Sequence, residues 1–282
     1  MNAEFFLNKI KEEFPELVWK KYRYVSHGYD HDVVILDDKV VFRFPKSKEY
    51  ENSLYNETKL LSYLKKKIHT GIPDYFLISK NKSLAGYKFL DGRELNFSLF
   101  KRLGSTEKDD IAQQIAGFLT NLHTIPKSIA KKYKVTTDDA AKSYNRLVND
   151  TEKYLFPRLN KKEILLVTEY FKELKIALDF KHADVLIHKD LTWEHIFWDS
   201  KKKKVNIIDF SDRSFGDPAS DFTGLWEYGL KFVNQIYDLY QGKKDEKMLY
   251  RSQLYLKKTP LSAKIIYVIP LRRLQSDVGA PT

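Results

Sequence analysis

Residues 186–195 read Leu-Ile-His-Lys-Asp-Leu-Thr-Trp-Glu-His, and residues 205–212 read Val-Asn-Ile-Ile-Asp-Phe-Ser-Asp. In the first stretch Asp190 follows a short apolar run, and His195 stands five residues later. In the second stretch Asp209 ends another apolar run. This arrangement suits phosphoryl transfer, because one carboxylate can orient or deprotonate an acceptor hydroxyl while the other helps to hold the magnesium ion of a nucleoside triphosphate.

Two of these three residues also have a plainer interpretation. Asp190 could cap a loop, although the position of Asp209 favours a catalytic role for it. Asp209 offers the oxygen ligands that magnesium prefers. His195 is favoured as a metal ligand, since a neutral imidazole nitrogen can bind the ion, and the plainer alternative is a core histidine or one that supports a ligand.

The composition is that of a globular protein, with 282 residues, 43% hydrophobic and 14% aromatic. The absence of cysteine excludes disulfides and thiolate zinc sites. The net charge of +11 raises the question of nucleic-acid or membrane binding, but the lysines are dispersed along the chain. We find no secretory signal and no apolar run of about 20 residues, so we expect a cytoplasmic protein without membrane or nucleic-acid partners.

Periodicity divides the chain into two parts. The first ninety residues read as a small sheet with one internal helix, and the remainder is mostly helical. We therefore expect an α+β protein with an N-terminal lobe at 1–90 and a C-terminal lobe at 91–282. The expected strands are 22–25, 32–36, 40–44, 75–79, 84–90, 185–187 and 205–208. The expected helices are 5–14, 53–67, 111–125, 140–154, 163–180 and 222–240. The apolar tail after Pro260 has an extended pattern.

The first part carries features of a phosphate-binding site. The loop from Ser26 to Asp30 joins two predicted strands, and its Gly28 lets the backbone approach a phosphate closely. Arg43 alternates with apolar neighbours on its strand, which places a permanent positive charge on the opposite face. Glu57 on the following helix could pair with it, as in kinases. Lys46 competes with Arg43 for this role, and a surface ion pair is the plainer alternative.

Together these residues resemble those of the aminoglycoside phosphotransferases, a branch of the protein-kinase-like fold, and most closely the 2''-phosphotransferases. The resemblance extends over about 240 residues. It is carried by the loop 26–30, the segments 41–46, 56–57, 85–90 and 118–123, the two stretches quoted above, and 216–222. It implies two lobes, with a small antiparallel sheet in the first and a mostly helical second lobe. The histidine at 195 and the Phe-Arg-Phe-Pro-Lys segment favour the 2'' type.

The resemblance also implies roles for individual residues. Asp190 would be catalytic, and His195 and Asp209 would bind Mg2+. Asp217 and Asp221 would brace the catalytic loop. The residues implied for nucleotide binding are Ser26, Gly28, Arg43, Glu57, Tyr87, Lys88, Leu90 and Ile208. Tyr87 would narrow the base pocket, which in this family is associated with a preference for GTP over ATP.

An aminoglycoside is a polycation, so nearby carboxylates must recognise its ammonium groups. Asp190, Asp212, Glu194 and Glu227 are the candidates. The resemblance thus implies transfer of the terminal phosphate of GTP to an aminoglycoside hydroxyl, by a monomer. The alternatives are a kinase of the same fold acting on choline, homoserine or a sugar, and a nucleotide-binding protein without catalysis.

Overall fold

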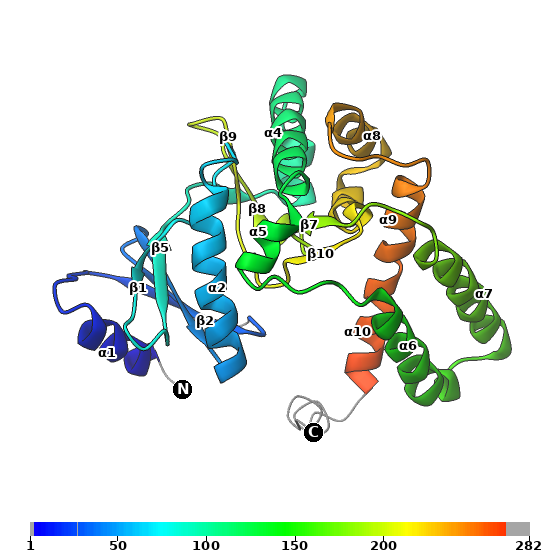
Figure 1. Ribbon diagram of the computed structural model, residues 1–282, viewed down its shortest axis with the longest axis horizontal. Coiled ribbons are helices and arrows are strands. Elements are labelled where there is room, and N and C mark those ends of the chain that lie inside the picture. The colour runs from blue at the N-terminus through cyan, green and yellow to red at the C-terminus, as the bar shows by residue number, and fades with distance from the viewer. Residues whose placement is uncertain (1–2, 27, 269–282) are drawn as a thin grey trace.

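The computed structural model describes residues 3–26 and 28–268, with side chains to residue 265. Its first part is a five-stranded antiparallel sheet in the order β1-β2-β3-β5-β4. The strands are β1 (Tyr22–Val25), β2 (His31–Leu36), β3 (Val40–Pro45), β4 (Tyr75–Ile78) and β5 (Ala85–Lys88), accompanied by α1 (Ala3–Glu13) and α2 (Lys48–Leu64). Figure 1 shows this sheet on the left, with α2 between it and the helical remainder.

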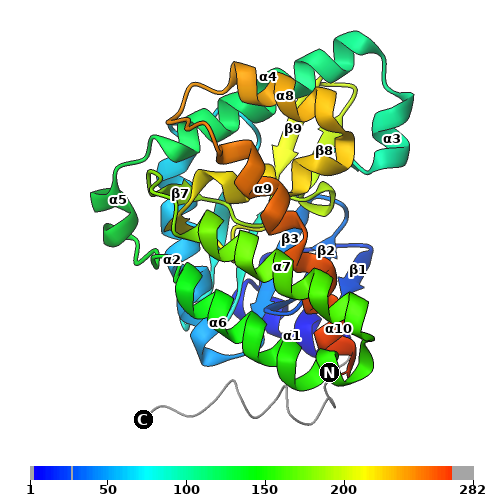
Figure 2. The ribbon, with the colours of Figure 1, turned by 90° about the vertical axis from the view of Figure 1, so that its right-hand side faces the viewer.

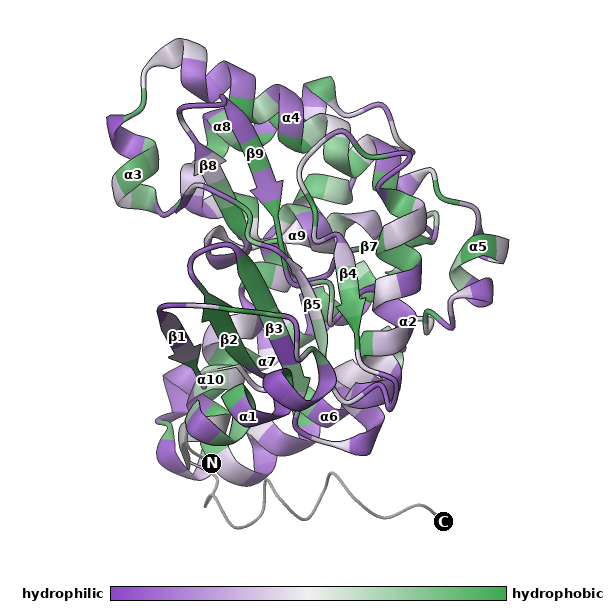
Figure 3. Cartoon of the chain, turned by 90° about the vertical axis from the view of Figure 1, so that its left-hand side faces the viewer, coloured by the Kyte–Doolittle hydropathy of each residue, from purple (hydrophilic) through white to green (hydrophobic). Residues whose placement is uncertain are grey.

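Alternation along β3 fixes which side chains face the core. Phe42 and Phe44 are buried in a cluster with Phe6 and Ile10 of α1, so α1 covers that face of the sheet. Val41 and Arg43 point to the opposite face, as the sequence predicted. Strands β2 and β3 accordingly appear mostly green in the hydropathy view of Figure 3, apart from a purple band on β3.

Helix α2 begins five residues earlier than the apolar stripe predicted, at Lys48 rather than at 53. The reason is local, because the side chain of Ser47 accepts a hydrogen bond from the backbone N–H of Tyr50 and caps the helix. Glu49 and Glu51 in the first turn favour the same start through the helix dipole.

The remainder of the chain is mostly helical. Its helices are α3 (Phe97–Arg102), α4 (Ser105–His123), α5 (Lys127–Lys132), α6 (Ala140–Asp150), α7 (Lys161–Leu178), α8 (Leu230–Leu239), α9 (Met248–Leu256) and α10 (Lys258–Val268). Short helical turns are η1 (Thr151–Leu155), η2 (Phe156–Arg158), η3 (Trp193–His195), η4 (Pro218–Phe222) and η5 (Gly224–Tyr228). Helices α6, α7, α9 and α10 pack together across the middle and lower part of the view in Figure 2.

Two small sheets carry the motifs quoted first. The strands are β6 (Arg93–Glu94), β7 (Val185–Ile187), β8 (Ile196–Asp199), β9 (Lys204–Ile207) and β10 (Ser214–Gly216). They pair as β10-β7 and as β6-β8-β9. Their apolar side chains are almost wholly buried, which explains why both motifs follow unbroken apolar runs. The predicted α+β, kinase-like fold, with a small antiparallel sheet followed by a mostly helical remainder, is confirmed.

The large core does not end at the expected lobe boundary. Leu60, Leu61 and Leu64 of α2 belong to the same apolar cluster as the helices of the second part. In addition, Gly71 forms an isolated parallel bridge with Asn206 of β9. The first ninety residues therefore contribute directly to the core of the helical part.

Two predicted elements differ from the structure. The segment after Pro260, predicted as extended, is helical through Val268, and the rest of that run lies outside the described residues. Ile265 is buried in the large core, and a short apolar run cannot be assigned by periodicity alone. The single helix predicted at 222–240 is broken into η5 and α8 by Gly229, whose φ of 90° lies in the left-handed region.

No helix within the described ranges combines the length and the apolar character that crossing a bilayer requires.

Candidate active site

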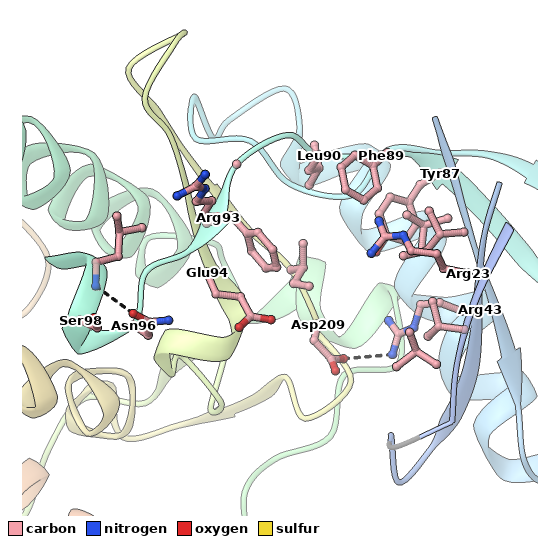
Figure 4. A pocket seen from close by; sticks show the side chains of 18 of the residues that line it. Arg23, Arg43, Tyr87, Phe89, Leu90, Arg93, Glu94, Asn96, Ser98 and Asp209 are labelled. Carbon is pink, nitrogen blue, oxygen red and sulfur yellow. Dashed lines mark hydrogen bonds and ion pairs between the residues drawn. The ribbon is translucent and has the colours of Figure 1, made fainter. Parts of the chain in front are cut away.

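A cavity of about 730 Å³ lies between the five-stranded sheet and the second part of the chain (Figure 4). Strands β1, β2, β3 and β5 supply one wall through Val25, Val33, Val41, Arg43 and Tyr87. The opposite wall comes from the segment 92–102 and from Phe197, Ile208 and Asp209. A cleft of this size, lined by both apolar and charged side chains, suits a nucleotide.

His195 brings the two aspartates of the sequence motifs together. Its Nδ1 lies 3.3 Å from Oδ2 of Asp190, and its Nε2 lies 3.7 Å from Oδ2 of Asp209. Both carboxylates are partly exposed, at 40% and 38%, whereas the imidazole is 17% exposed. The two aspartates therefore converge on His195, and Asp209 also lines the cavity.

The orientation of His195 fits a metal ligand. Nδ1 lies 2.8 Å from the backbone oxygen of Asp190, an acceptor, so Nδ1 carries the proton. In the neutral ring Nε2 then keeps a lone pair, which faces the carboxylate of Asp209. Within the described residues no group of three or more His, Asp or Glu side chains forms a complete metal site. This donor pair is sufficient for magnesium only where phosphate oxygens and water supply the remaining ligands.

His188 connects the two loops that carry the aspartates. Its Nε2 donates to the backbone oxygen of Ile208 over 3.0 Å, and its Nδ1 accepts from the N–H of Asp190 over 3.3 Å. Burial lowers the pKa of His188, which keeps the ring neutral in this arrangement. Asp209 has a φ of 61°, so its position depends on such long-range contacts.

Asp221 braces the catalytic loop, as the sequence predicted. Its carboxylate accepts hydrogen bonds from the backbone N–H groups of His188, over 2.9 Å, and of Lys189, over 2.6 Å. His123 Nε2 lies 3.0 Å from the same carboxylate, and His123 Nδ1 contacts the hydroxyl of Tyr240. Asp217 has a different structural role, since its carboxylate is held by Arg251 through two nitrogen–oxygen contacts and none of its hydrogen bonds within the described residues reaches the loop of Asp190.

Arg43 forms the ion pair with Glu57 that the sequence predicted. Its Nη1 donates to Oε1 of Glu57 over 2.9 Å, and Glu57 is 1% exposed. The other guanidinium nitrogen donates to Asp209 over 3.0 Å and to the hydroxyl of Ser211 over 2.6 Å. Tyr75 adds a hydrogen bond to Glu57. This network places a permanent cation beside the carboxylate expected to bind metal, as the dashed line in Figure 4 marks.

The charges in this network keep one another ionised. Burial alone would raise the pKa of Asp209, but the positive charge of Arg43 outweighs it, so the pKa of this carboxyl is lowered. Burial and the positive charge of Arg43 together lower the pKa of His31 to about 3. Neutral His31 can therefore accept a hydrogen bond from Arg43 through Nδ1, at 3.0 Å.

Only some of the residues expected to bind the nucleotide line the cavity. Tyr87, Leu90 and Ile208 line the cavity beside Arg43, whereas Glu57 lies behind Arg43. Ser26, Gly28 and Lys88 are not among the described residues that line it, and Ser26 lines a second hollow beside α1.

Lys46, the competitor of Arg43, points elsewhere. Its Nζ donates to the backbone oxygens of Ser26 and Gly28 and so supports the loop.

The four candidate acceptor carboxylates form two pairs of like charge. Burial and the charge of Asp190 raise the pKa of Asp212. Burial and the charge of Glu194 raise the pKa of Glu227. Asp190 also contacts His195, so the first pair lies beside the place where the two aspartates meet.

The sequence analysis missed several residues of the site. Tyr75, Ser211 and Arg213 contact the network around Glu57 and Arg43, and His31 accepts from Arg43. Only Ser211 had a usable signal, because it follows Asp209 by two residues in the quoted stretch. Arg213 directly follows that stretch, but no pattern marks it, and His31 and Tyr75 lie far from both quoted stretches in sequence.

The comparisons with known proteins agree with this geometry. A model of the phosphotransferase enzyme family matches residues 21–246. The solved GDP and kanamycin complex of APH(2'')-IIIa has a TM-score of 0.83 at 24% identity, covering 92% of this chain and 90% of that one. The streptomycin-ATP ternary complex of APH(2'')-IIa has a TM-score of 0.72 at 23% identity, covering 99% and 95%. Macrolide 2'-phosphotransferase MphH from Brachybacterium faecium has a TM-score of 0.72 at 16% identity, covering 94% and 92%.

At these identities the solved structures establish the fold, whereas the family model spans most of the chain. Together with the convergence of Asp190, His195 and Asp209, it identifies the kind of enzyme. The chain belongs to the phosphotransferase enzyme family and is a nucleotide-dependent phosphotransferase with an alcohol group as acceptor.

Proposed function

We propose that this enzyme moves the terminal phosphate of GTP, with ATP as the alternative donor, to the 2''-hydroxyl of an aminoglycoside, which would inactivate the antibiotic. The observation that carries this proposal is the convergence of Asp190, His195 and Asp209 beside the buried ion pair of Arg43 and Glu57. Glu194 and Glu227 are exposed, so an ammonium group of the acceptor would meet two accessible carboxylates there. The solved relatives bound to kanamycin and streptomycin support the same class of acceptor.

In this proposal the nucleotide base lies between the backbone of Lys88 and Leu90 and the side chain of Tyr87. Its phosphates extend toward Arg43 and the loop at Ser26 and Gly28, with Ile208 packing beneath the nucleotide. Arg43 neutralises charge that develops on the transferred phosphate, and Glu57 fixes Arg43 by a buried ion pair. His195 and Asp209 would hold a magnesium ion, which would supply further neutralisation of phosphate charge.

Asp190 would accept a hydrogen bond from the attacking hydroxyl and receive its proton. The new bond joins the acceptor oxygen to the terminal phosphorus, and the bond from that phosphorus to the departing nucleoside diphosphate breaks. Asp212 beside Asp190, and the Glu194–Glu227 pair, would hold ammonium groups and so aim the hydroxyl.

A turnover assay tests the proposal directly. Release of nucleoside diphosphate is measured with GTP and with ATP, each crossed with kanamycin, gentamicin, streptomycin, choline and homoserine. We expect turnover to depend on an aminoglycoside, and the modified hydroxyl is then identified by NMR. If turnover depends on choline or homoserine instead, the acceptor is a small alcohol and not an aminoglycoside.

A macrolide is a second candidate acceptor, because the chain also resembles a macrolide 2'-phosphotransferase over nearly its whole length. A macrolide belongs in the same screen. The lobes at 1–90 and 91–282, a cytoplasmic location, a monomeric state and the absence of nucleic-acid and membrane partners remain predictions.

A further inference from the structure

Arg213 is a buried cation that phosphoryl transfer, as described above, does not use. It is 7% exposed and follows Asp209 by four residues. Its Nη1 lies 3.3 Å from Oε2 of Glu57 and donates to the backbone oxygen of Phe210 over 2.9 Å. Its Nη2 donates to the backbone oxygen of Ser53 over 2.9 Å. One guanidinium thus contacts both α2 and the segment that carries Asp209.

Glu57 is the point at which two arginines meet. Oε1 faces Arg43, and Oε2 faces Arg213. A buried carboxylate between two guanidinium groups is held in one orientation, because rotation would leave a buried charge without its partner. The position of Arg43 therefore depends on Arg213 through Glu57.

The metal-binding segment is held from both sides by the same two arginines. Arg43 donates to Asp209 and to the hydroxyl of Ser211, while Arg213 holds the carbonyl between them, that of Phe210. Asp209 has a left-handed φ of 61°, so its segment is not set by local preference. Arg213 holds the backbone carbonyl of Phe210, the residue that directly follows Asp209.

We propose that Arg213 is a positioning residue for phosphoryl transfer. It holds Asp209 and Arg43 in their relative positions, because it links the Asp209–Ser211 segment to α2 through Glu57. It acts on the groups that meet the nucleotide and the metal, and it does not touch either itself. The inference rests on the phosphotransferase activity and is independent of which acceptor the enzyme uses.

The test compares Arg213→Met, Arg213→Lys and the surface control Arg146→Met. Arg146 lies on α6 with an exposed side chain, so its variant should behave as the wild type. Calorimetry gives the dissociation constants of GTP and ATP with Mg2+ and with EDTA. Hydrolysis with water as acceptor gives kcat and the half-saturating Mg2+ concentration without any assumption about the acceptor.

For Arg213→Met we expect a fall in kcat/KM of roughly 10- to 100-fold, the range expected for a misplacement of about 1 Å. The half-saturating Mg2+ concentration should rise, and nucleotide affinity should lose most of its dependence on Mg2+. Arg213→Lys keeps a charge beside Glu57 but cannot reach both carbonyls, so it should fold and give intermediate values. If Arg213 had a purely structural role, Arg213→Met would lower Tm but would leave the half-saturating Mg2+ concentration unchanged.

A double variant tests the route through Glu57. Groups that act as a unit give non-additive losses, so Glu57→Gln combined with Arg213→Met should be little worse than Glu57→Gln alone. Additive losses of kcat/KM in the double variant would contradict the proposal. A half-saturating Mg2+ concentration in Arg213→Lys equal to that of the wild type would also contradict it. Failure of Arg213→Lys to fold would assign this arginine to stability alone and also overturn the proposal.

Discussion

At the scale of single residues, the site consists of charges whose roles follow from their partners. Asp190 and Asp209 are both carboxylates on loops after short strands, yet their surroundings differ. Asp209 has Arg43 within 3.0 Å, which lowers its pKa and suits a group that stays ionised. Asp190 contacts His195 and keeps 40% of its side chain exposed, which suits a group that meets the acceptor.

The variant Asp190→Ala should therefore lose turnover and keep its nucleotide. We expect kcat to fall roughly 100- to 10,000-fold, the usual contribution of a general base. The dissociation constant of the nucleotide, measured by calorimetry, should change little. Asp238→Ala, at an exposed position on α8, serves as the control. Retained turnover in Asp190→Ala would remove this residue from the chemistry.

Tyr87 tests the choice of donor. Its ring is 6% exposed, lines the cavity and lies edge-on against Tyr75, with centroids 5.1 Å apart. Tyr87→Ala should open the base side of the cavity and lower the ratio of kcat/KM for GTP to that for ATP. The ratio is compared with that of Phe76→Ala, which truncates an exposed ring on β4. An unchanged ratio would contradict a role for Tyr87 in selecting GTP.

His31 links the site to pH. Its pKa is about 3 in the folded protein and near 6.5 in an unfolded chain. Between these values the unfolded chain binds more protons, so the contribution to stability is complete above about pH 6.5 and is lost as the pH falls toward 3. Urea unfolding between pH 7.5 and 4.5 should show this slope.

The variant His31→Asn should flatten that slope, whereas His69→Asn, at an exposed histidine, should not. His188 should contribute to the slope that remains, because burial lowers its pKa too. The same slope in His31→Asn and in the wild type would show that this histidine does not contribute.

At the scale of elements, the catalytic loop is held by groups from distant helices. Asp221 of η4 binds two consecutive backbone N–H groups of the loop, and His123 of α4 binds Asp221. Lys189 has a φ of 73°, a conformation in which a residue with a side chain is strained. The brace therefore opposes relaxation of the residue that precedes Asp190.

Replacing Asp221 by asparagine should release this brace. Its amide has one oxygen, so one of the buried N–H groups loses its charged acceptor, at a cost of roughly 3 kcal/mol. We expect Tm to fall by several degrees and kcat to fall with it, since Asp190 moves. Asp179→Asn, at the exposed end of α7, is the matched control. Wild-type Tm and kcat in Asp221→Asn would refute the bracing role.

At the scale of the whole molecule, the cavity joins two parts of the chain that share one apolar core. Strands of the first part form one wall, and Phe197, Ile208 and Asp209 belong to the other. Helix α2 extends the large core into the first part. A ligand that contacts both walls should therefore stabilise the entire fold.

Thermal unfolding measures this effect. Nucleotide with Mg2+ at 100 times its Kd should add about 2.7 kcal/mol, which corresponds to a rise in Tm of several degrees at this size. At the same nucleotide concentration the rise in Tm should be smaller in Arg43→Met, because this variant lacks the cation facing the phosphates and binds the nucleotide more weakly. Absence of any rise with either GTP or ATP would contradict nucleotide binding in this cavity.

The sequence by itself determined the local features of the protein. Alternation along 40–44 placed Arg43 opposite Phe42 and Phe44, because successive side chains of a strand point to opposite faces. Asp190 and Asp209 could be located because each follows a short apolar run. A buried strand must end before a charged group can reach a cleft. These features depend on neighbours a few residues away, which a pattern can detect.

The tertiary structure alone decided which distant groups meet. Arg43 and Asp209 are 166 residues apart in the chain, and Arg213 and Glu57 are 156 apart. The helical state of 258–268 depended on packing against the large core, which the apolar pattern of that segment does not encode. Such contacts follow from the way packed elements bury a common core, whereas periodicity reports only the faces of each element separately.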